Sequence, residues 1–208
     1  FNIRFRKDSL MRSTLPTNFT KPDLIDFQLL ELLGNVADLH GNDYDSLFIP
    51  FRCVASDVTT KQSVVFDKGP LNESVRASMT YPFFITPIYV DNKLLFDGGL
   101  YNNFPSDILY HEFSPDYILG SNVSSNEPPP QQHDVISQIT NMLVRPTNFS
   151  LPCHAGYIVN HQSGLSTFDF DKVDEAIQKG YENTIAKIDS ICTDLKVRSN
   201  KSDLKTRR

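Results

Sequence analysis

The most chemically suggestive feature of the sequence is a carboxylate followed by two glycines, Asp97-Gly98-Gly99, directly after the strand-like stretch 93–96. Two interpretations compete. Asp-Gly is a strong turn signal, and the tripeptide taken alone favours a turn. Alternatively, the carboxylate is a base held on a rigid strand end, and the glycines let the backbone pass close to a substrate or to a neighbouring loop.

Several further motifs stand around this tripeptide in a fixed order. They are Arg76-Ala77-Ser78, Pro82-Phe83-Phe84, Pro87-Ile88, Asp97-Gly98-Gly99 and Asn102-Asn103-Phe104-Pro105. The string resembles the patatin-like phospholipase family, which has an Ala-Ser, Pro, Phe, Pro segment ahead of an Asp-Gly-Gly or Asp-Gly-Ala motif. The flanks resemble the family as well, at 52–57, Asp169-Phe170 and Gly180-Tyr181. The resemblance runs from about Phe48 to Tyr181.

That resemblance implies ester hydrolysis by a Ser–Asp dyad in a three-layer α/β/α domain. A serine would attack the acyl carbonyl of a lipid, and the aspartate would take its proton directly. Carried over to this sequence, the motif makes Asp97 the catalytic base, with Gly98, Gly99, Ser78 and Asn103 as supporting residues. The implied partners are a phospholipid or another acyl lipid and a membrane surface. The dyad chemistry implies no metal and no organic cofactor.

The sequence departs from the family at the nucleophile. A nucleophile elbow reads Gly-x-Ser-x-Gly. Only Gly164-Leu165-Ser166 begins this pattern, but Phe168 replaces the second glycine and the serine follows Asp97, whereas the family places it before. The glycine-rich oxyanion loop is missing too, because Gly98-Gly99 is the sole glycine doublet. We therefore expect a domain that is incomplete at its N-terminus, with the serine upstream of Phe1 in a longer protein.

Two other functions stay open at this point. A relative that keeps the fold without the serine would be a non-catalytic module that binds lipid or protein. A spacer domain beside an outer-membrane β-barrel is the third alternative, since some bacterial patatin-like proteins carry such a barrel behind the hydrolase domain. The analogy with bacterial members favours a cell-envelope or secreted location.

Other residues with reactive side chains have ordinary structural explanations. Asn102 and Asn103 either brace the Asp97 loop or form a turn before a helix. Four histidines follow Asp97 without a group to orient them: His111, His133, His154 and His161. Cys153 and His154 would point to opposite faces of a strand. Three acidic residues fit the N-terminal charges of a helix better than a metal site: Asp169, Asp171 and Asp174.

Composition narrows the classes further. A chain of 208 residues is long enough for one domain with a core, and we expect that domain over 1–195. The net charge of −5 gives the surface no bulk attraction for nucleic acid. Basic residues gather at 196–208, which predicts a solvated, flexible tail. Three scattered cysteines do not form a disulfide framework or a zinc site: Cys53, Cys153 and Cys192. No apolar run approaches the length of a membrane span.

Strands alternate with helices along the chain, which predicts an α/β fold with a mainly parallel sheet flanked by helices. The predicted strands are 47–54, 63–66, 93–96, 117–123 and 157–159. The predicted helices are 24–33 with Gly34 as its stop, 72–79 with Asn72 as its cap, 105–113, 135–143 and 173–192. We expect 47–54, 93–96 and 117–123 to be parallel neighbours, with Asp97 at the carboxyl edge of their sheet.

An incomplete domain would leave apolar surface uncovered. The isolated chain is therefore expected to self-associate or to be marginally stable.

Overall fold

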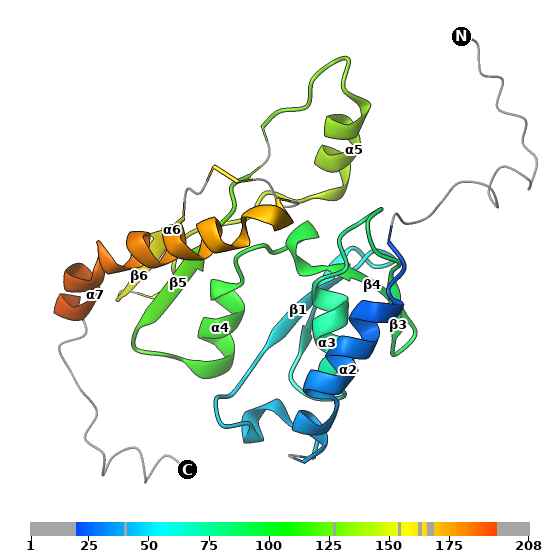
Figure 1. Ribbon diagram of the computed structural model, residues 1–208, viewed down its shortest axis with the longest axis horizontal. Helices are drawn as coiled ribbons and strands as arrows, with labels where there is room; N and C mark the ends of the chain where they lie inside the picture. Colours follow the sequence, from blue (N-terminus) through cyan, green and yellow to red (C-terminus); the bar gives the residue numbers. More distant parts are fainter. Residues whose placement is uncertain are drawn as a thin grey trace, which may run out of the picture. The chain divides into compact units, whose positions relative to one another are not determined.

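The structure is a computed structural model that describes residues 20–39, 41–126, 128–153, 155–161, 164–165 and 169–194. Within these ranges the chain forms two compact units (Figure 1). Of the described residues, the first contains those within 20–103 and 130–145, and the second contains those within 104–129 and 146–194. Two units can belong to one domain, so the single domain expected over 1–195 stays a prediction. The expected basic tail lies outside the described residues.

The first unit contains a four-stranded sheet with the order β2-β1-β4-β3. Its strands are β1 (Cys53–Asp57), β2 (Gln62–Phe66), β3 (Ile88–Val90) and β4 (Lys93–Asp97). All three neighbouring pairs are antiparallel. Asp91 and Asn92 connect β3 to β4 with positive φ angles of 48° and 61°, the conformation that a two-residue hairpin needs.

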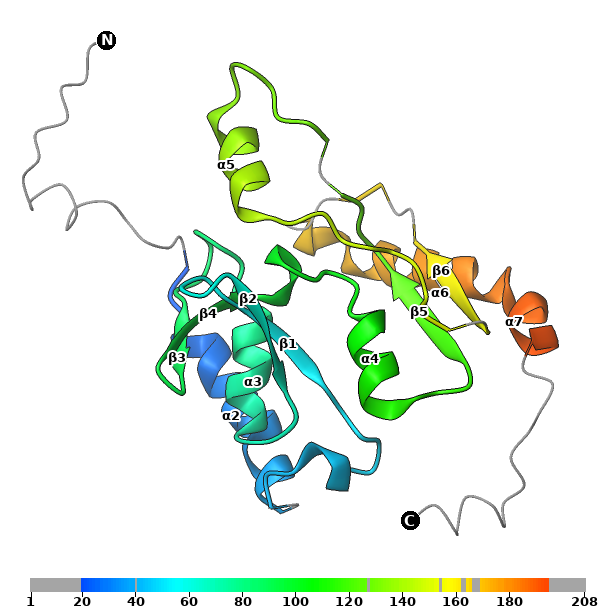
Figure 2. The same cartoon turned by 180° about the vertical axis from the view of Figure 1, so that it is seen from behind.

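One helix packs on this sheet, and a second helix packs on the first. Helix α3 (Leu71–Ser78) packs against β1 and β4, and α2 (Asp23–Asp38) lies beside α3, as Figure 2 shows. Two 3₁₀ turns, η1 (Tyr44–Ser46) and η2 (Gly98–Leu100), and helix α5 (Val135–Leu143) complete the unit. The core lies between α3 and the sheet, and its buried residues are Tyr44, Cys53, Ala55, Phe66, Leu71, Ala77 and Leu95.

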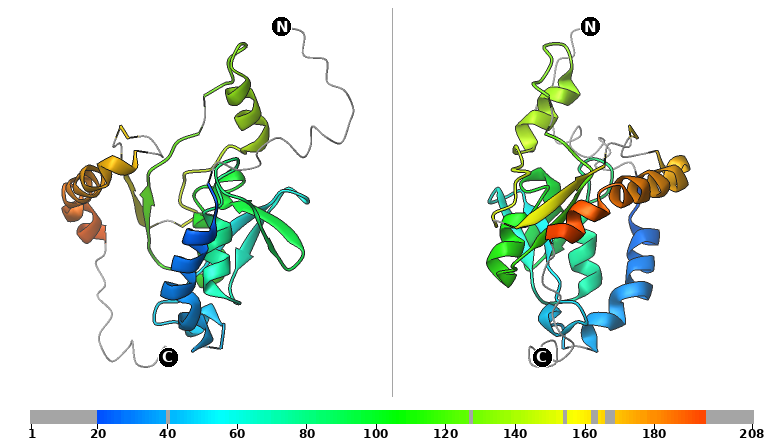
Figure 3. Two further views of the ribbon diagram at one scale, coloured as in Figure 1. Left: turned by 45° about the vertical axis from the view of Figure 1, so that its right-hand side comes forward. Right: turned by 90° about the vertical axis from the view of Figure 1, so that its left-hand side faces the viewer.

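The second unit contains two parallel strands. Strand β5 (Ile118–Asn122) pairs in register with β6 (Gly156–Asn160), and the two lie side by side in Figure 3. Helix α4 (Ser106–Phe113) precedes β5. The turn η3 (Phe170–Lys172) and helices α6 (Val173–Ile185) and α7 (Ile188–Asp194) follow β6. Within the described residues, no helix combines the length and the apolar character that crossing a bilayer requires.

The combination of helices with a sheet that contains parallel strands confirms the α/β class. The predicted pairing is wrong, however. Strand β1 pairs with β4 in antiparallel orientation, and β5 pairs with β6 in a separate sheet. Strand β3 joins β4 through a two-residue connection, which can only join antiparallel strands, so β4 has an antiparallel neighbour on each side.

Several predicted boundaries also differ, and four of the differences have a clear structural reason. Strand β1 begins at Cys53 instead of residue 47, because the Phe51 N–H donates to the Tyr44 carbonyl and Phe48 is 84% exposed. Helix α2 continues through Gly34, because Leu33 packs against the core.

Helix α3 begins before Asn72, because Pro70 is its N-cap and the Pro70 carbonyl accepts the first helical N–H groups. The predicted helix 173–192 is two helices. It is interrupted where Lys187 N–H bonds to the Thr184 carbonyl in a tighter turn.

Candidate active site

Asp97 is the last residue of β4 and is held there from two sides. It pairs with Ala55 of β1, and its N–H donates to the carbonyl oxygen of Thr80 at 2.9 Å. Thr80 lies two residues beyond α3, so the turn after that helix supports the strand end. The carboxylate is therefore carried by the end of a regular strand, and the glycines after it form the turn η2, so the structure is compatible with both interpretations of the tripeptide.

The Asp97 side chain is oriented by the turn that follows it. Its Oδ1 atom accepts the Gly99 N–H at 2.8 Å, so Asp97 caps the 3₁₀ turn η2. Among the described residues, no hydrogen bond to Oδ2 is present. Burial raises the pKa of Asp97 above the ordinary value of an aspartate, and the Gly99 N–H opposes part of that shift. One carboxylate oxygen is thus fixed, and the group is more basic than an exposed aspartate.

Close packing explains why glycine occupies positions 98 and 99. A Cβ atom on Gly98 would lie 2.4 Å from the backbone oxygen of Val54 in β1, nearer than real atoms approach. A Cβ on Gly99 would lie 2.8 Å from Asn103 Oδ1. Ser56, which is fully buried, also donates its hydroxyl to the Gly98 carbonyl at 3.4 Å. The close backbone approach expected of these glycines is therefore an approach to β1 and to the Asn103 side chain.

Ser78 and Asp97 both influence a residue that the sequence did not single out, Cys53. Its thiol donates to the Ser74 carbonyl at 3.3 Å, and it is buried in the core. Burial raises the pKa of Cys53, the Ser78 hydrogen bond lowers it, and the negative charge of Asp97 raises it further. Strand alternation could have revealed this neighbour, because Cys53 lies two residues before Ala55, the register partner of Asp97.

The two asparagines after the motif differ in role. The Asn102 N–H donates to the Gly98 carbonyl at 2.9 Å, which closes the turn η2. Asn103 contributes its side chain, which lies against Gly99. Both contacts are with the turn that follows Asp97, whereas helix α4 begins later, at Ser106.

The remaining candidates lie elsewhere in the chain. His111 belongs to α4, His133 precedes α5 and is exposed, and His161 follows β6. His154 and Ser166 lie outside the described residues, so the partial elbow and the Cys153–His154 pair have no structural counterpart to report. Three acidic residues lie at the start of helical segments, as expected of N-terminal helix charges: Asp169 before η3, Asp171 within it and Asp174 in the first turn of α6. Among the described residues, no three His, Cys, Asp or Glu side chains gather as metal ligands would.

A model of the patatin-like phospholipase family matches residues 5–110, just over half of the chain. The chain belongs to the patatin-like phospholipase family, as the order of its motifs predicted. The match includes every motif from 52 to Pro105. It ends before Asp169-Phe170 and Gly180-Tyr181, whose likeness to a closing helix stays a prediction.

Individual relatives agree with the family. The chain is 40% identical over 76 residues to an uncharacterized NTE family protein of Mycobacterium tuberculosis, covering 36% of this chain and 21% of that protein. It is 32% identical over 94 residues to a patatin-like phospholipase domain-containing protein of Caenorhabditis elegans, covering 44% and 6%. It is 28% identical over 113 residues to the neuropathy target esterase of Drosophila melanogaster, covering 53% and 8%. The chain spans about a fifth or less of the length of these relatives.

Proposed function

We propose that this chain contributes the general base of a serine-dependent lipid acyl hydrolase. Asp97 is the base, and the nucleophilic serine comes from a segment of the longer protein outside these 208 residues. The observation that carries the proposal is the state of the Asp97 carboxylate, which stands at a strand end with Oδ1 fixed by Gly99 and a raised pKa.

The chemistry follows from that arrangement. The serine hydroxyl attacks the acyl carbonyl carbon while its proton passes to Asp97 Oδ2, the oxygen that the Gly99 N–H does not hold. The alcohol of the lipid leaves with that proton, and an acyl-serine remains. Water then attacks the acyl group, Asp97 takes a proton from the water, and the serine is restored when the fatty acid is released.

A raised pKa suits this role. A carboxylate with a higher pKa binds the serine proton more strongly, and general-base efficiency increases with basicity as long as the group remains ionised. Partial burial also keeps the carboxylate from being fully solvated, so less water has to leave when the serine approaches. The substrate class that accompanies this dyad is a phospholipid or a related acyl lipid, presented at a membrane surface.

The test compares the longer protein with two of its variants on a short-chain acyl ester and on phospholipid vesicles. Asp97→Asn, nearly isosteric but unable to accept the proton, should lower kcat by about a hundred- to ten-thousandfold. Asp57→Asn is the matched control, since Asp57 also ends a strand of the same sheet, where it caps the following turn through Thr59 and Thr60. It should retain the parental rate.

The 208-residue chain, assayed in parallel, should show no turnover because it holds a base without a placed nucleophile. Near-parental activity of Asp97→Asn would refute the dyad. Turnover by the isolated chain that a serine-directed phosphonate blocks would move the nucleophile into these residues. Absence of activity in the longer protein itself would favour the non-catalytic alternative.

A further inference from the structure

The end of α3 contains a buried cation, Arg76, whose side chain is only 4% exposed. Burying a guanidinium is unfavourable unless it is paired and hydrogen-bonded. Arg76 meets that requirement through its ion pair with Asp26 of α2. It also donates to the Thr80 hydroxyl and, at 2.8 Å, to the Thr86 carbonyl. One side chain thus joins α2, the turn after α3 and the segment that leads into β3.

Thr80 connects this cation to Asp97. It is fully buried, and its hydroxyl both accepts from the Arg76 guanidinium and donates to the Arg76 carbonyl at 2.8 Å. The backbone carbonyl of the same residue accepts the Asp97 N–H at 2.9 Å. The hydrogen bonds with Arg76 therefore hold Thr80 in place, and the Thr80 carbonyl in turn holds the backbone of Asp97.

The need for this contact follows from the sheet. Strand β3 is short, and its first residue, Ile88, pairs with Leu95 of β4. The β3–β4 ladder therefore stops two residues before Asp97. The Asp97 N–H has no partner in β3, and it donates to the Thr80 carbonyl instead. This hydrogen bond therefore fixes the backbone of the residue whose side chain is the carboxylate.

We propose that Arg76 is a positioning residue for Asp97, acting through Thr80. Its catalytic consequence rests on the function proposed above, whereas its structural consequence does not. The planar guanidinium can serve Asp26, Thr80 and Thr86 at once because its donors diverge in a fixed plane, which a lysine ammonium cannot reproduce.

The structural arm of the test uses the 208-residue chain and measures hydrogen exchange of the Asp97 amide. Arg76→Gln and Thr80→Val should each speed this exchange by about tenfold or more relative to a reference amide in the core, such as that of Ala55. Thr80→Val is nearly isosteric and keeps the carbonyl, so it decides the question if Arg76→Gln does not fold.

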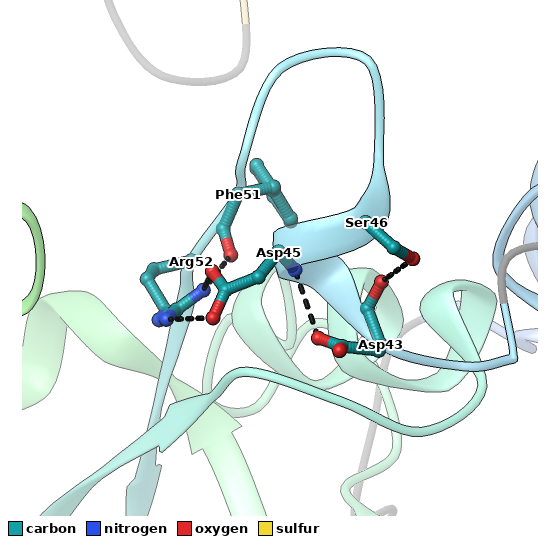
Figure 4. Close-up of polar contacts among 5 residues, drawn as sticks. All are labelled: Asp43, Asp45, Ser46, Phe51 and Arg52. Atoms are coloured by element: carbon teal, nitrogen blue, oxygen red, sulfur yellow. Dashed lines mark hydrogen bonds and ion pairs between the residues drawn. The ribbon is translucent and has the colours of Figure 1, made fainter. Parts of the chain in front are cut away.

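The matched control is Arg52→Gln. Arg52 is also a largely buried arginine paired with an aspartate, since its guanidinium holds both oxygens of Asp45 and the Phe51 carbonyl (Figure 4). None of these contacts reaches the Thr80–Asp97 hydrogen bond. Arg52→Gln should leave Asp97 exchange unchanged relative to the core. Unchanged exchange in Thr80→Val, or an equal rise at every core amide, would overturn the positioning role.

The catalytic arm uses the longer protein. Arg76→Gln should lower kcat with KM nearly unchanged, because the base acts in the chemical step, and Arg76→Lys should restore only part of the loss. A rise in KM with kcat unchanged would overturn the catalytic consequence. If Asp97→Asn keeps its activity, the proposed function fails, and the exchange measurement still decides the positioning role.

Discussion

Replacing Gly98 by alanine is expected to disturb the Asp97 motif more than any other single added methyl group. The new Cβ would lie 2.4 Å from the Val54 carbonyl oxygen, whereas ordinary contacts begin at 3.4 Å, so the atoms would overlap by about 1 Å. The oxygen is backbone within β1, which means that no side-chain rotation relieves the overlap. The two paired strands have to separate instead.

The size of the effect follows from that geometry. Overpacking costs about 1–3 kcal/mol, and moving hydrogen-bonded strands belongs at the upper end, so we expect a loss of about 3 kcal/mol. In a chain of this length that corresponds to a fall in Tm of about 6–12 °C. Because Gly98 has no positive φ, the backbone conformation itself does not disfavour alanine.

Gly99→Ala is the matched control. Its nearest contact, 2.8 Å from Asn103 Oδ1, is with the end of a side chain that can rotate, so the expected loss is below about 1.5 kcal/mol. Thermal unfolding followed by circular dichroism would compare the two variants with the parent chain. A Gly98→Ala protein as stable as the parent, or less affected than Gly99→Ala, would refute the packing explanation for the glycine pair.

Four more outcomes are expected. Burial raises the pKa of Asp97, so the penalty for its charge grows as pH rises through the acid range. Urea unfolding should therefore show Asp97→Asn gaining stability over the parent above about pH 4. Hydrogen bonds from the following turn lower the pKa of Asp57, so Asp57→Asn should lose stability at neutral pH, and this loss should shrink as pH falls below about 4. If either variant showed the same pH dependence of stability as the parent, the direction given for the pKa of that aspartate would be contradicted. In α6 an i, i+4 row of apolar side chains is 47–65% exposed. We propose that this row mediates the expected self-association, so Ile177→Gln should lower the apparent mass in light scattering, and an unchanged mass would contradict the proposal. Arg145 donates its backbone N–H to the Leu100 carbonyl and stacks on Tyr101, so Arg145→Gln should lower Tm without abolishing folding, and an unchanged Tm would show that the stacking adds no stability.

The sequence predicted the features that depend on local patterns. Asp97 stands at a strand end because the apolar stretch before it forms β4 and the two glycines after it end the strand. The helix 135–143 appears with the predicted bounds. The family followed from the order of motifs and is confirmed by the family model.

Features set by distant contacts could not be predicted in this way. The sequence shows Arg76 as part of a motif but does not predict its ion pair, because Asp26 lies 50 residues earlier in the chain. The antiparallel pairing of β1 with β4 joins residues far apart in the chain, such as Ala55 and Asp97, and local patterns do not encode it. The apolar run from residue 47 predicts a buried strand, but Pro50 cannot donate to a ladder and the Phe51 N–H donates to the Tyr44 carbonyl instead.

The central claim is that Asp97 activates a serine that lies outside this chain. The most direct measurement is the rate and the site of labelling of the longer protein by a serine-directed phosphonate, in the parent and in Asp97→Asn. The account predicts a single labelled serine outside residues 1–208, and labelling slowed by about a hundredfold or more in Asp97→Asn. Labelling at the parental rate in Asp97→Asn, or a labelled serine within this chain, would contradict it.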